Sequence, residues 1–535
     1  MHLNLKRIGL YVLSVAALVV VVQACVTRIY RSNYTDVNKL LHDTKNINNR
    51  PFLKAHLKNG DVCILRDSWS VDTTLDLVNG TGQRYNAYRK QIFEGQMSLP
   101  IDSVAIFETN IKIKKNESGR VAALTILAGI EVALGVLCLT DPKACFGSCP
   151  TFYLNEKDNF HYADAEGFSN AILPSMEYGD LDALNIHDLK SSELSVFMKN
   201  EALETHCINE VKLLAYPVSN GERVFQTVDN QFYLCDNLYE LKQAKAAEGD
   251  VTRLMKSMDR TERFSLSDPK NLNSKEEILL EFEQTQRDGD LGLILNFRQT
   301  LMTTYLFYNA MGYMGEHVSD VFNILETNDK MKSQFDATTQ LLGGIKCYVW
   351  NEANKKWLFT KELTETGPIA INRQFIHMGN AAKGQKLKVK LELNKGLWRL
   401  DYAALAQIKQ LVKPIEISPS LVLDKGKRDH QALHDLKTEG RYLISMPGSS
   451  YQLKFSMPAE SGKYELFLYS KGYYLEWMRQ HWLKDKNMLK LQQMVYQPGM
   501  YLMKVAPNYK QYESAMEQMF WDSKIDTKTF SYYDK

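Results

Sequence analysis

Hydrophobic and charged residues alternate along the segment 387–393, and this period of two constrains the fold more than any other feature. Leu387, Val389, Leu391 and Leu393 are separated by two lysines and a glutamate. Successive side chains of a β-strand point to opposite faces, so such a run fits a strand with one face in a core. Apolar runs such as LGLILNF recur between turn signals, and helical patterns are fewer. The sequence therefore predicts a β-rich α+β fold.

The chain of 535 residues is too long for one hydrophobic core. Turn signals and polar stretches divide it into seven predicted segments. They are a lipoprotein signal (1–25), a tether (26–50), a small β barrel-like domain (51–119), an apolar helix (120–143), a β-sandwich-like module with a helix at 300–326 (144–335), a second β-sandwich-like module (336–475) and C-terminal helices (476–535).

The small β domain is predicted to contain about five strands. Its turn signals are Asn59-Gly60-Asp61 and the cluster NGTG at 79–82. Asn-Gly and related pairs supply the positive φ that tight hairpins require.

The first 25 residues have the pattern of a secretory signal. Lys6 and Arg7 precede an unbroken apolar run over 8–22, and Cys25 follows a small residue. This resembles a bacterial lipobox, in which the cysteine is acylated, for example with palmitate, and becomes the new N-terminus. Each buried methylene contributes about 0.8 kcal/mol, so two or three chains would hold the protein on a membrane. The alternative is an uncleaved helix over 8–26, which is long enough to span a bilayer.

Both interpretations of the N-terminus place most of the chain outside the cytoplasm. Lipidation at Cys25 predicts anchoring to the outer membrane in a bacterial cell envelope. Val26-Thr27-Arg28 lacks the acidic residues associated with surface export in such bacteria, so we expect the periplasmic face.

The second long apolar segment is RVAALTILAGIEVALGVLCLT at 120–140. Its one acid, Glu131, would cost on the order of 3 kcal/mol near a bilayer centre. Three interpretations remain: a buried helix between domains, a helix lying in the membrane interface, and a second span. A span would tend to stop an outer-membrane lipoprotein in the inner membrane during export, so we favour the first two.

Cysteine number indicates disulfides and at least one free thiol. Setting Cys25 aside leaves seven cysteines, an odd number, in a compartment where disulfides persist. We expect a structural disulfide among Cys138, Cys145 and Cys149. Further disulfide candidates are Cys207 and Cys235. The alternative, a reactive thiol or metal site at the 145–149 pair, lacks the Cys-x-x-Cys spacing and a second pair.

Charge and composition exclude one class of partner. The formal net charge is +2, and no Lys/Arg block is flanked by stacking aromatics, which argues against nucleic-acid binding. The expected partners are the membrane, through the lipid anchor, and envelope proteins or a glycan.

Two groups of polar residues are candidates for catalysis. His430 and His434 would share a helix face and could hold a metal, but Gln431 stands where a zinc protease has its general base. An acidic tract could supply paired carboxylates for glycoside hydrolysis. It contains Asp164, Glu166, Glu177, Asp180 and Asp182. We interpret the histidines as a solvated helical turn and the acids as loop caps, and we predict no catalytic residue, metal or cofactor.

Aromatic residues gather between 464 and 482. Apolar side chains occupy both faces of the strand at 464–469, so we expect that strand to be covered on both sides. Trp477 and Trp482 are the better candidates for surface anchors of a ligand or partner.

Seven sequence blocks resemble an uncharacterised family of bacterial, Bacteroidota-type, envelope lipoproteins. They are CFGSCPTFY, DAEGFSNAILPSMEYGDLDAL, NEALETHCINEVKLL, RQTLMTTYLFY, ETGPIAI, KGLWRLDYAAL and YELFLYSKGYYLEWMR. The resemblance covers residues from about 50 to 522 and implies an envelope location and two modules, with no catalytic residue. Residue 469 is Tyr where the family favours an acid, so the resemblance implies no role for that position.

The function hypothesis from sequence is a non-catalytic envelope lipoprotein that acts as a binding or scaffolding component of a membrane-associated complex or surface glycan. The alternative is an envelope hydrolase of glycan or peptide that uses the acids at 164–182 or the His430/His434 pair. A third hypothesis, a thiol oxidant, requires a reactive Cys145.

Mass spectrometry of the mature protein tests the anchor. We expect the mature chain to begin at Cys25 and to carry acyl chains, and Cys25→Ser to keep the unprocessed N-terminus and lose membrane association. An unmodified wild-type chain that begins at Met1 would contradict the lipoprotein interpretation.

Overall fold

The computed structural model describes most of the chain. The described residues are 28–34, 37–44, 53–57, 61–66, 69–85, 91–113, 149–154, 163–172, 174–186, 188–189, 191–202, 204–283, 290–318, 321–322, 325, 328–364, 367–379, 387–446, 448–458, 462–476 and 486–523. Strands contain 51% of the residues and helices contain 21%, which confirms the predicted β-rich α+β class. The described residues form two compact units, one from segments within 28–113 and one from segments within 149–523.

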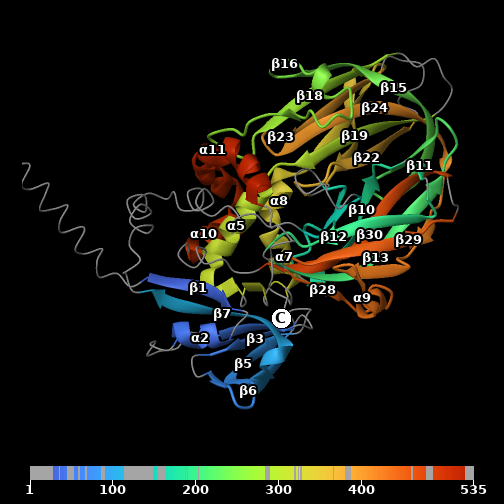
Figure 1. Ribbon diagram of the computed structural model, residues 1–535. Helices are drawn as coiled ribbons and strands as arrows, with labels where there is room; N and C mark the ends of the chain where they lie inside the picture. The colour runs from blue at the N-terminus through green and yellow to red at the C-terminus, as the bar shows by residue number, and fades with distance from the viewer. Residues whose placement is uncertain are drawn as a thin grey trace, which may run out of the picture. The chain divides into compact units, whose positions relative to one another are not determined.

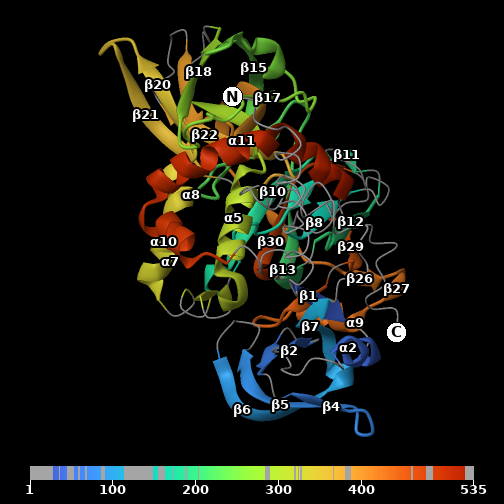
Figure 2. The same cartoon turned by 90° about the vertical axis from the view of Figure 1, so that its left-hand side faces the viewer.

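The first unit is an antiparallel sheet of seven strands that curls into a half-barrel (Figure 2). Its order is β1-β7-β2-β3-β5-β4, with β6 paired to β5. The strands are β1 (Arg28–Tyr34), β2 (Leu53–Leu57), β3 (Val62–Leu65), β4 (Ser70–Asp72), β5 (Leu77–Tyr85), β6 (Gln91–Pro100) and β7 (Val104–Ile113). Leu53, Trp69, Val78 and Phe107 belong to its buried core.

The segment predicted as a tether contains secondary structure. β1 pairs with β7 from Arg28↔Ile113 to Tyr34↔Phe107, and helix α2 (Val37–Thr44) buries Leu40 in the core of the unit. The polar composition of this segment led to the prediction of a tether without regular structure. Strands pair through backbone groups, which every residue type has, so a polar segment can also join a sheet.

The NGTG cluster, predicted as a turn, lies inside β5. A Cβ on Gly82 would lie 2.0 Å from the carbonyl oxygen of Ile64, so glycine allows a close approach between neighbouring backbones here. The turn falls instead at 73–76, where Asp72 accepts hydrogen bonds from the backbone N–H groups of Thr74 and Leu75.

The second unit contains an antiparallel sheet of eleven strands with the main order β21-β20-β23-β18-β15-β24-β19-β22. The terminal strands β21 and β22 contact each other, so the sheet is nearly closed like a barrel. Its strands are β14 (Arg223–Gln226), β15 (Phe232–Ala246), β16 (Gly249–Asp250), β17 (Arg263–Phe264), β18 (Lys275–Phe282), β19 (Leu291–Gln299), β20 (Ile345–Asn351), β21 (Lys356–Leu363), β22 (Asn372–Gly379), β23 (Lys388–Asn394) and β24 (Trp398–Leu411).

Two six-stranded sheets complete the β structure of the described part of this unit. One contains β10 (Tyr178–Leu184), β11 (Asp188–Leu189), β13 (Glu204–Pro217), β25 (Ile415–Ile417), β28 (Leu443–Ser445) and β30 (Gly462–Glu476). The other contains β8 (Thr151–Tyr153), β9 (Ala165–Glu166), β12 (Glu193–Lys199), β26 (Leu421–Asp424), β27 (Lys427–Arg428) and β29 (Ser450–Ser456).

Strands from the two predicted modules, 144–335 and 336–475, share the same sheets. β13 pairs with β30, β15 with β24 and β18 with β23. The structure therefore differs from two consecutive sandwiches, because partners more than a hundred residues apart leave no mark in the local pattern of either strand.

The helices α5, α7, α8, α10 and α11 contact one another at one side of the sheets (Figure 1). They are α5 (Met302–Met314), α7 (Asp329–Phe335), α8 (Ala337–Leu342), α10 (Met488–Tyr496) and α11 (Pro498–Ser523). α5 is buried on nearly all sides, as expected for a helix that is apolar around its circumference. It begins near the predicted position and is interrupted after Met314 by Gly315, where φ is +53°; described residues at 318, 321, 322 and 325 are again helical, within the predicted range of 300–326.

Several parts of the sequence prediction lie outside the described residues. They are the signal with Cys25, the apolar segment 120–143, Cys138, Cys145, Trp477 and Trp482. Within the part that the structure describes, no helix has both the length and the hydrophobicity to cross a membrane.

Replacement of Gly472 tests how closely β30 packs on β13. A Cβ at this position would lie 2.3 Å from the carbonyl oxygen of Cys207 and 2.9 Å from the ring of Phe168. Gly472→Ala is therefore expected to lower the free energy of unfolding by about 3 kcal/mol in a urea titration. Gly499→Ala is the control, because its nearest neighbour would be 3.7 Å away. We expect it to be neutral or slightly stabilising. Equal losses in the two variants would contradict this account.

Candidate functional site

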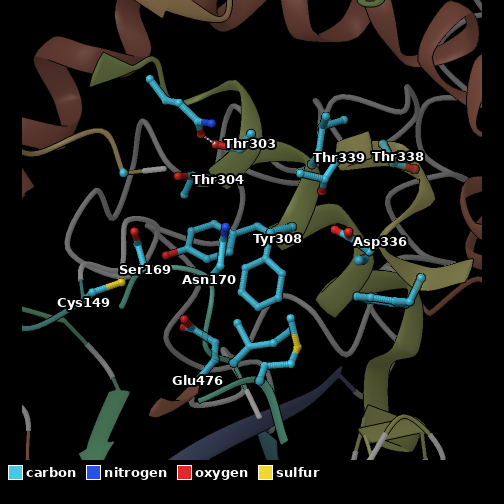
Figure 3. A pocket seen from close by; sticks show the side chains of 18 of the residues that line it. Cys149, Ser169, Asn170, Thr303, Thr304, Tyr308, Asp336, Thr338, Thr339 and Glu476 are labelled. Carbon is cyan, nitrogen blue, oxygen red and sulfur yellow. Dashed lines mark hydrogen bonds between the residues drawn. The ribbon is translucent and has the colours of Figure 1, made fainter. Parts of the chain in front are cut away.

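A cavity of about 270 Å³ lies in the second unit (Figure 3). One side is formed by α5, α7 and α8, and the other by the segment that follows β9 and by the ends of β13 and β30. Met494 of α10 also lines it.

Six of the seven sequence blocks quoted above contribute to the lining of this cavity. Their lining residues include Cys149 (145–153), Glu166 and Asn170 (164–184), Glu204 (200–214), Gln299, Thr304 and Tyr308 (298–308), Gly367 (365–371), and Tyr474 and Glu476 (464–479). Segments separated by more than 300 residues, such as those of Cys149 and Glu476, therefore meet at one place.

The cavity has a buried acidic floor and a more exposed rim. Three glutamates line the floor and are almost fully buried: Glu166 is 5% exposed, Glu204 2% and Glu476 3%. Asn170 and Thr339 are solvent-exposed at the rim.

A tight turn holds the carboxylate of Glu166. Its Oε2 accepts hydrogen bonds from the backbone N–H groups of Ile369 (2.8 Å) and Ala370 (3.2 Å). Gly367 precedes them with φ of +116°, and a Cβ there would lie 2.7 Å from the same oxygen. Only glycine fits this conformation and this distance, so the turn is built around the carboxylate.

Strand pairing and a hydrogen bond fix the backbone of Glu166. The residue lies opposite Thr151 in the β8–β9 ladder, and its backbone N–H donates to Oδ2 of Asp182 at 2.8 Å. The backbone and the carboxylate are thus both held, and the side chain has little freedom to move.

Glu204 and Glu476 lie directly opposite each other at the end of the β13–β30 ladder. Opposite residues in an antiparallel pair have Cβ atoms about 5 Å apart, so the register brings two carboxylates together at the cavity floor. On the side of β13, Oε2 of Glu204 is also 3.1 Å from Nε2 of His206, which is fully buried.

The helix α5 supplies hydroxyl groups and rings to the facing wall. Thr303 donates from its Oγ1 to Oε1 of Gln299 at 2.8 Å, and Thr304 and Tyr308 follow along the helix (Figure 3). Residues four apart share a helix face, which explains why Thr304 and Tyr308 both reach the cavity.

The thiol of Cys149 lies in this acidic environment. Burial raises its pKa well above the ordinary value, and the nearby carboxylates of Glu166, Glu204, Asp180 and Glu476 raise it further. The thiol therefore stays protonated, which makes it a poor nucleophile.

The acidic tract predicted from sequence separates into different places. Only Glu166 lines the cavity. The other four acids accept hydrogen bonds from neighbouring groups: Asp164 from Leu154 N–H (2.7 Å), Asp180 from Leu181 N–H (3.0 Å), Asp182 from Glu166 N–H (2.8 Å) and Glu177 from the Tyr442 hydroxyl (3.4 Å). Asp180 and Asp182 lie within strand β10, so the prediction that they cap loops is wrong for these two residues; alternation within a strand, and not a turn, sets the direction of their side chains.

The two histidines lie on a short helix, α9 (His430–Asp435), and both are exposed. Asp429 caps the helix by accepting from the N–H of Ala432 at 2.9 Å. A helical turn was predicted here. Across the described ranges, no group of three His, Cys, Asp or Glu side chains is placed to hold a metal.

The remaining predicted features are the cysteines and the aromatic residues at 464–482, and the structure describes some of them. Cys149, Cys207 and Cys235 are buried, as are Cys63 and Cys347, and the structure joins none of these described cysteines to another by a disulfide. The predicted pairings of Cys138 and Cys145 lie outside the described residues and stay predictions. Tyr464, Phe467, Tyr473 and Tyr474 are buried, which confirms the prediction that this strand is covered.

A scan against protein-family models and a search of curated proteins found no match for the chain.

Sequence reasoning missed most of the cavity. Glu204, Glu476, Thr304 and Gln299 belong to no motif with a known spacing, and only register and helix packing bring them together. The available signal was the set of blocks itself, because those blocks contain most of the polar residues that line the cavity, although Lys332, Asp336, Thr338 and Thr339 lie outside them.

The pH dependence of stability tests the burial of Asp180. Burial raises the pKa of this carboxyl from 3.8 to about 6, against the opposing hydrogen bonds from Leu181 and Phe168. The folded state therefore holds a proton that the unfolded state releases between about pH 4 and pH 6, and stability falls as pH rises through this window. The free energy of unfolding of Asp180→Asn should fall less than that of the wild type between pH 4 and pH 7.

The matched control for Asp180 is Asp250→Asn. Hydrogen bonds from Thr252 lower the pKa of the Asp250 carboxyl, so it contributes stability that is lost as pH falls. Its replacement should change the slope in the opposite direction, below about pH 4. Parallel pH profiles for all three proteins in urea titrations would contradict the assignment.

Proposed function

We propose that this protein is a non-catalytic, lipid-anchored binding component of the bacterial envelope and that the cavity is the site of its small-molecule ligand. The anchor is Cys25, and the location is the periplasmic face of the outer membrane, in a membrane-associated complex. The observation that supports binding most directly is the cavity at which six of the seven sequence blocks meet.

The size and lining of the cavity suit a small ligand. Its volume of about 270 Å³ lies just below the range of roughly 300–1,000 Å³ for drug-sized molecules. Polar groups at the floor and on α5 can fix the orientation of a ligand, while Leu325, Leu342 and Met494 offer apolar contact.

The rigidity of the polar groups favours binding. Glu166 is held at its backbone and at its carboxylate, and Thr303 is held by Gln299. Groups fixed before a ligand arrives lose little conformational entropy on binding, so each contact contributes more to affinity.

The chemistry of the same groups gives less support to hydrolysis. Of the acids considered for a hydrolase, Glu166 alone lines the cavity, and backbone N–H groups already occupy one of its carboxylate oxygens. The thiol of Cys149 is protonated at neutral pH because its pKa is raised. We therefore favour binding over the hydrolase alternative.

Native mass spectrometry of the full-length protein, purified in mild detergent from cells that express it, tests the proposal. We expect the wild type to carry a small molecule that denaturation releases. Thr304→Trp should lose it, because the indole would fill the cavity, whereas Thr304→Val keeps the shape of threonine and should retain it. Retention of the same molecule by Thr304→Trp, or a wild-type protein with no bound molecule, would refute the proposal.

A further inference from the structure

We propose that Arg223 and Arg373 bind a small oxyanion, the carboxylate or phosphate group of a ligand, at one end of the barrel-like sheet. Neither arginine lines the cavity, so this inference goes beyond the proposed binding function and does not depend on it. Strand alternation places the two arginines at the same end of the sheet, and three of their nitrogens are buried without a hydrogen-bond partner.

The site is a polar layer of side chains beside an apolar core. The strands β14, β15, β19, β22 and β24 each contribute to that core, which includes Phe225, Ile294, Phe375 and Ala404. Side chains two positions apart on a strand share a face. The next layer is therefore polar and consists of Arg223, Asn296, Arg373 and Tyr402. The register agrees, because Asn296 lies opposite Arg373 on one side and opposite Tyr402 on the other.

Strand direction makes the two arginines neighbours. Each step of the series β14-β15-β24-β19-β22 is antiparallel, so β14 and β22 run in the same direction. The rings of Phe225 and Phe375 stack with their centroids 5.5 Å apart. Arg223 and Arg373 each stand two positions before one of these rings, so both lie at the same end of the stacked pair.

Arg373 is a buried guanidinium group without an ionic partner. The residue is 7% exposed, and its NH2 donates to Oδ1 of Asn185 at 2.9 Å. Its Nε and NH1 are buried without a hydrogen-bond partner, and no carboxylate of the described residues lies within ion-pair distance. Buried charges in proteins are normally paired, because an unpaired one is costly. Arg263, which is also buried, follows this rule with Glu248 and Glu276.

Arg223 supplies a second guanidinium group beside the first. Its Nε forms an ion pair with Oε1 of Glu465, while its NH2 is buried without a hydrogen-bond partner. Burial and the charge of Arg223 lower the pKa of Arg373 to about 10, although the carboxylates of Glu465 and Asp401 act in the opposite direction. The acids of the protein therefore compensate the charge of Arg373 only in part.

An oxyanion matches the groups that this layer offers. Each guanidinium group presents its N–H groups in a planar fork, which fits two oxygens of a carboxylate or a phosphate. Burial raises the pKa of Tyr402 and both guanidinium groups lower it, so its hydroxyl lies near them and adds a donor. The side chain of Arg223 is 19% exposed and Tyr402 is half-buried, so the layer reaches solvent.

The charge of the layer decides between an anion and other ligands. A water molecule could accept the same hydrogen bonds, but it would leave the charge of Arg373 uncompensated. A cation would be repelled by both guanidinium groups. An anion supplies the acceptors and the opposite charge together, and charge-assisted hydrogen bonds are stronger than neutral ones.

Titration calorimetry of the full-length protein with sodium phosphate and with sodium acetate tests the site, with sodium chloride holding the ionic strength constant. We expect binding of at least one oxyanion, and the tighter one shows whether the ligand carries a phosphate or a carboxylate. Arg373→Met should weaken that binding at least about tenfold, because methionine removes the charge and the donors. Arg263→Met is the matched control and should bind as the wild type does, because Arg263 is paired within the protein.

Melting temperatures in chloride buffer, without either oxyanion, separate binding from folding. Arg373→Met should melt at the same temperature as the wild type or higher, because it removes a buried charge that has no ionic partner. Arg263→Met should melt at a lower temperature, because it leaves the buried carboxylate of Glu276 without its arginine. Equal losses in the two variants would show that the protein itself compensates Arg373, and would overturn the proposal.

Two binding results would also overturn the proposal. One is no binding of phosphate or acetate by the wild type, and the other is equal affinity in the wild type and Arg373→Met. Thr304→Trp, which fills the cavity, should leave oxyanion binding unchanged. The two proposals therefore fail separately: the native mass spectrum decides the function of the cavity, and the oxyanion titrations decide the role of the arginines.

Discussion

The pairing of β13 with β30 is the constraint on which the second unit depends. It joins Glu204–Pro217 to Gly462–Glu476, so two segments about 250 residues apart in the sequence form one ladder at the centre of a sheet. The ladder is tight enough that Gly472 tolerates no side chain, and its last pair places Glu204 opposite Glu476. The same interaction that closes the fold therefore also builds the floor of the cavity.

Buried carboxylates have two roles around this ladder. Some organise the backbone: Asp182 accepts from the N–H of Glu166, and the carboxylate of Glu166 accepts from the turn that begins at Gly367. Such bonds offset the cost of burying charge. Glu204 and Glu476 instead lie opposite each other at the end of the ladder, and Oε2 of Glu204 is 3.1 Å from Nε2 of His206.

Local patterns in the sequence predicted elements well and partners poorly. The alternation at 387–393 corresponds to β23, the run at 291–297 to β19 and the turn at His430 to α9. The same reasoning placed a turn at 79–82, because the sequence does not show that the backbone of Ile64 passes close to Gly82. It also separated 144–335 from 336–475, since hydrogen bonds between distant strands leave no local period.

The sequence by itself determined the β-rich class, the places of several regular elements such as β19 and β23, and the chemistry available in each block, because side-chain alternation and turn residues act over a few positions. Tertiary structure alone decided that Glu166, Glu204, Tyr308 and Glu476 share one cavity. It also decided that the remaining acids of the predicted tract bond to neighbouring groups. The physical reason is that register and helix packing depend on the fit of surfaces far apart in the chain, and no single segment carries that information.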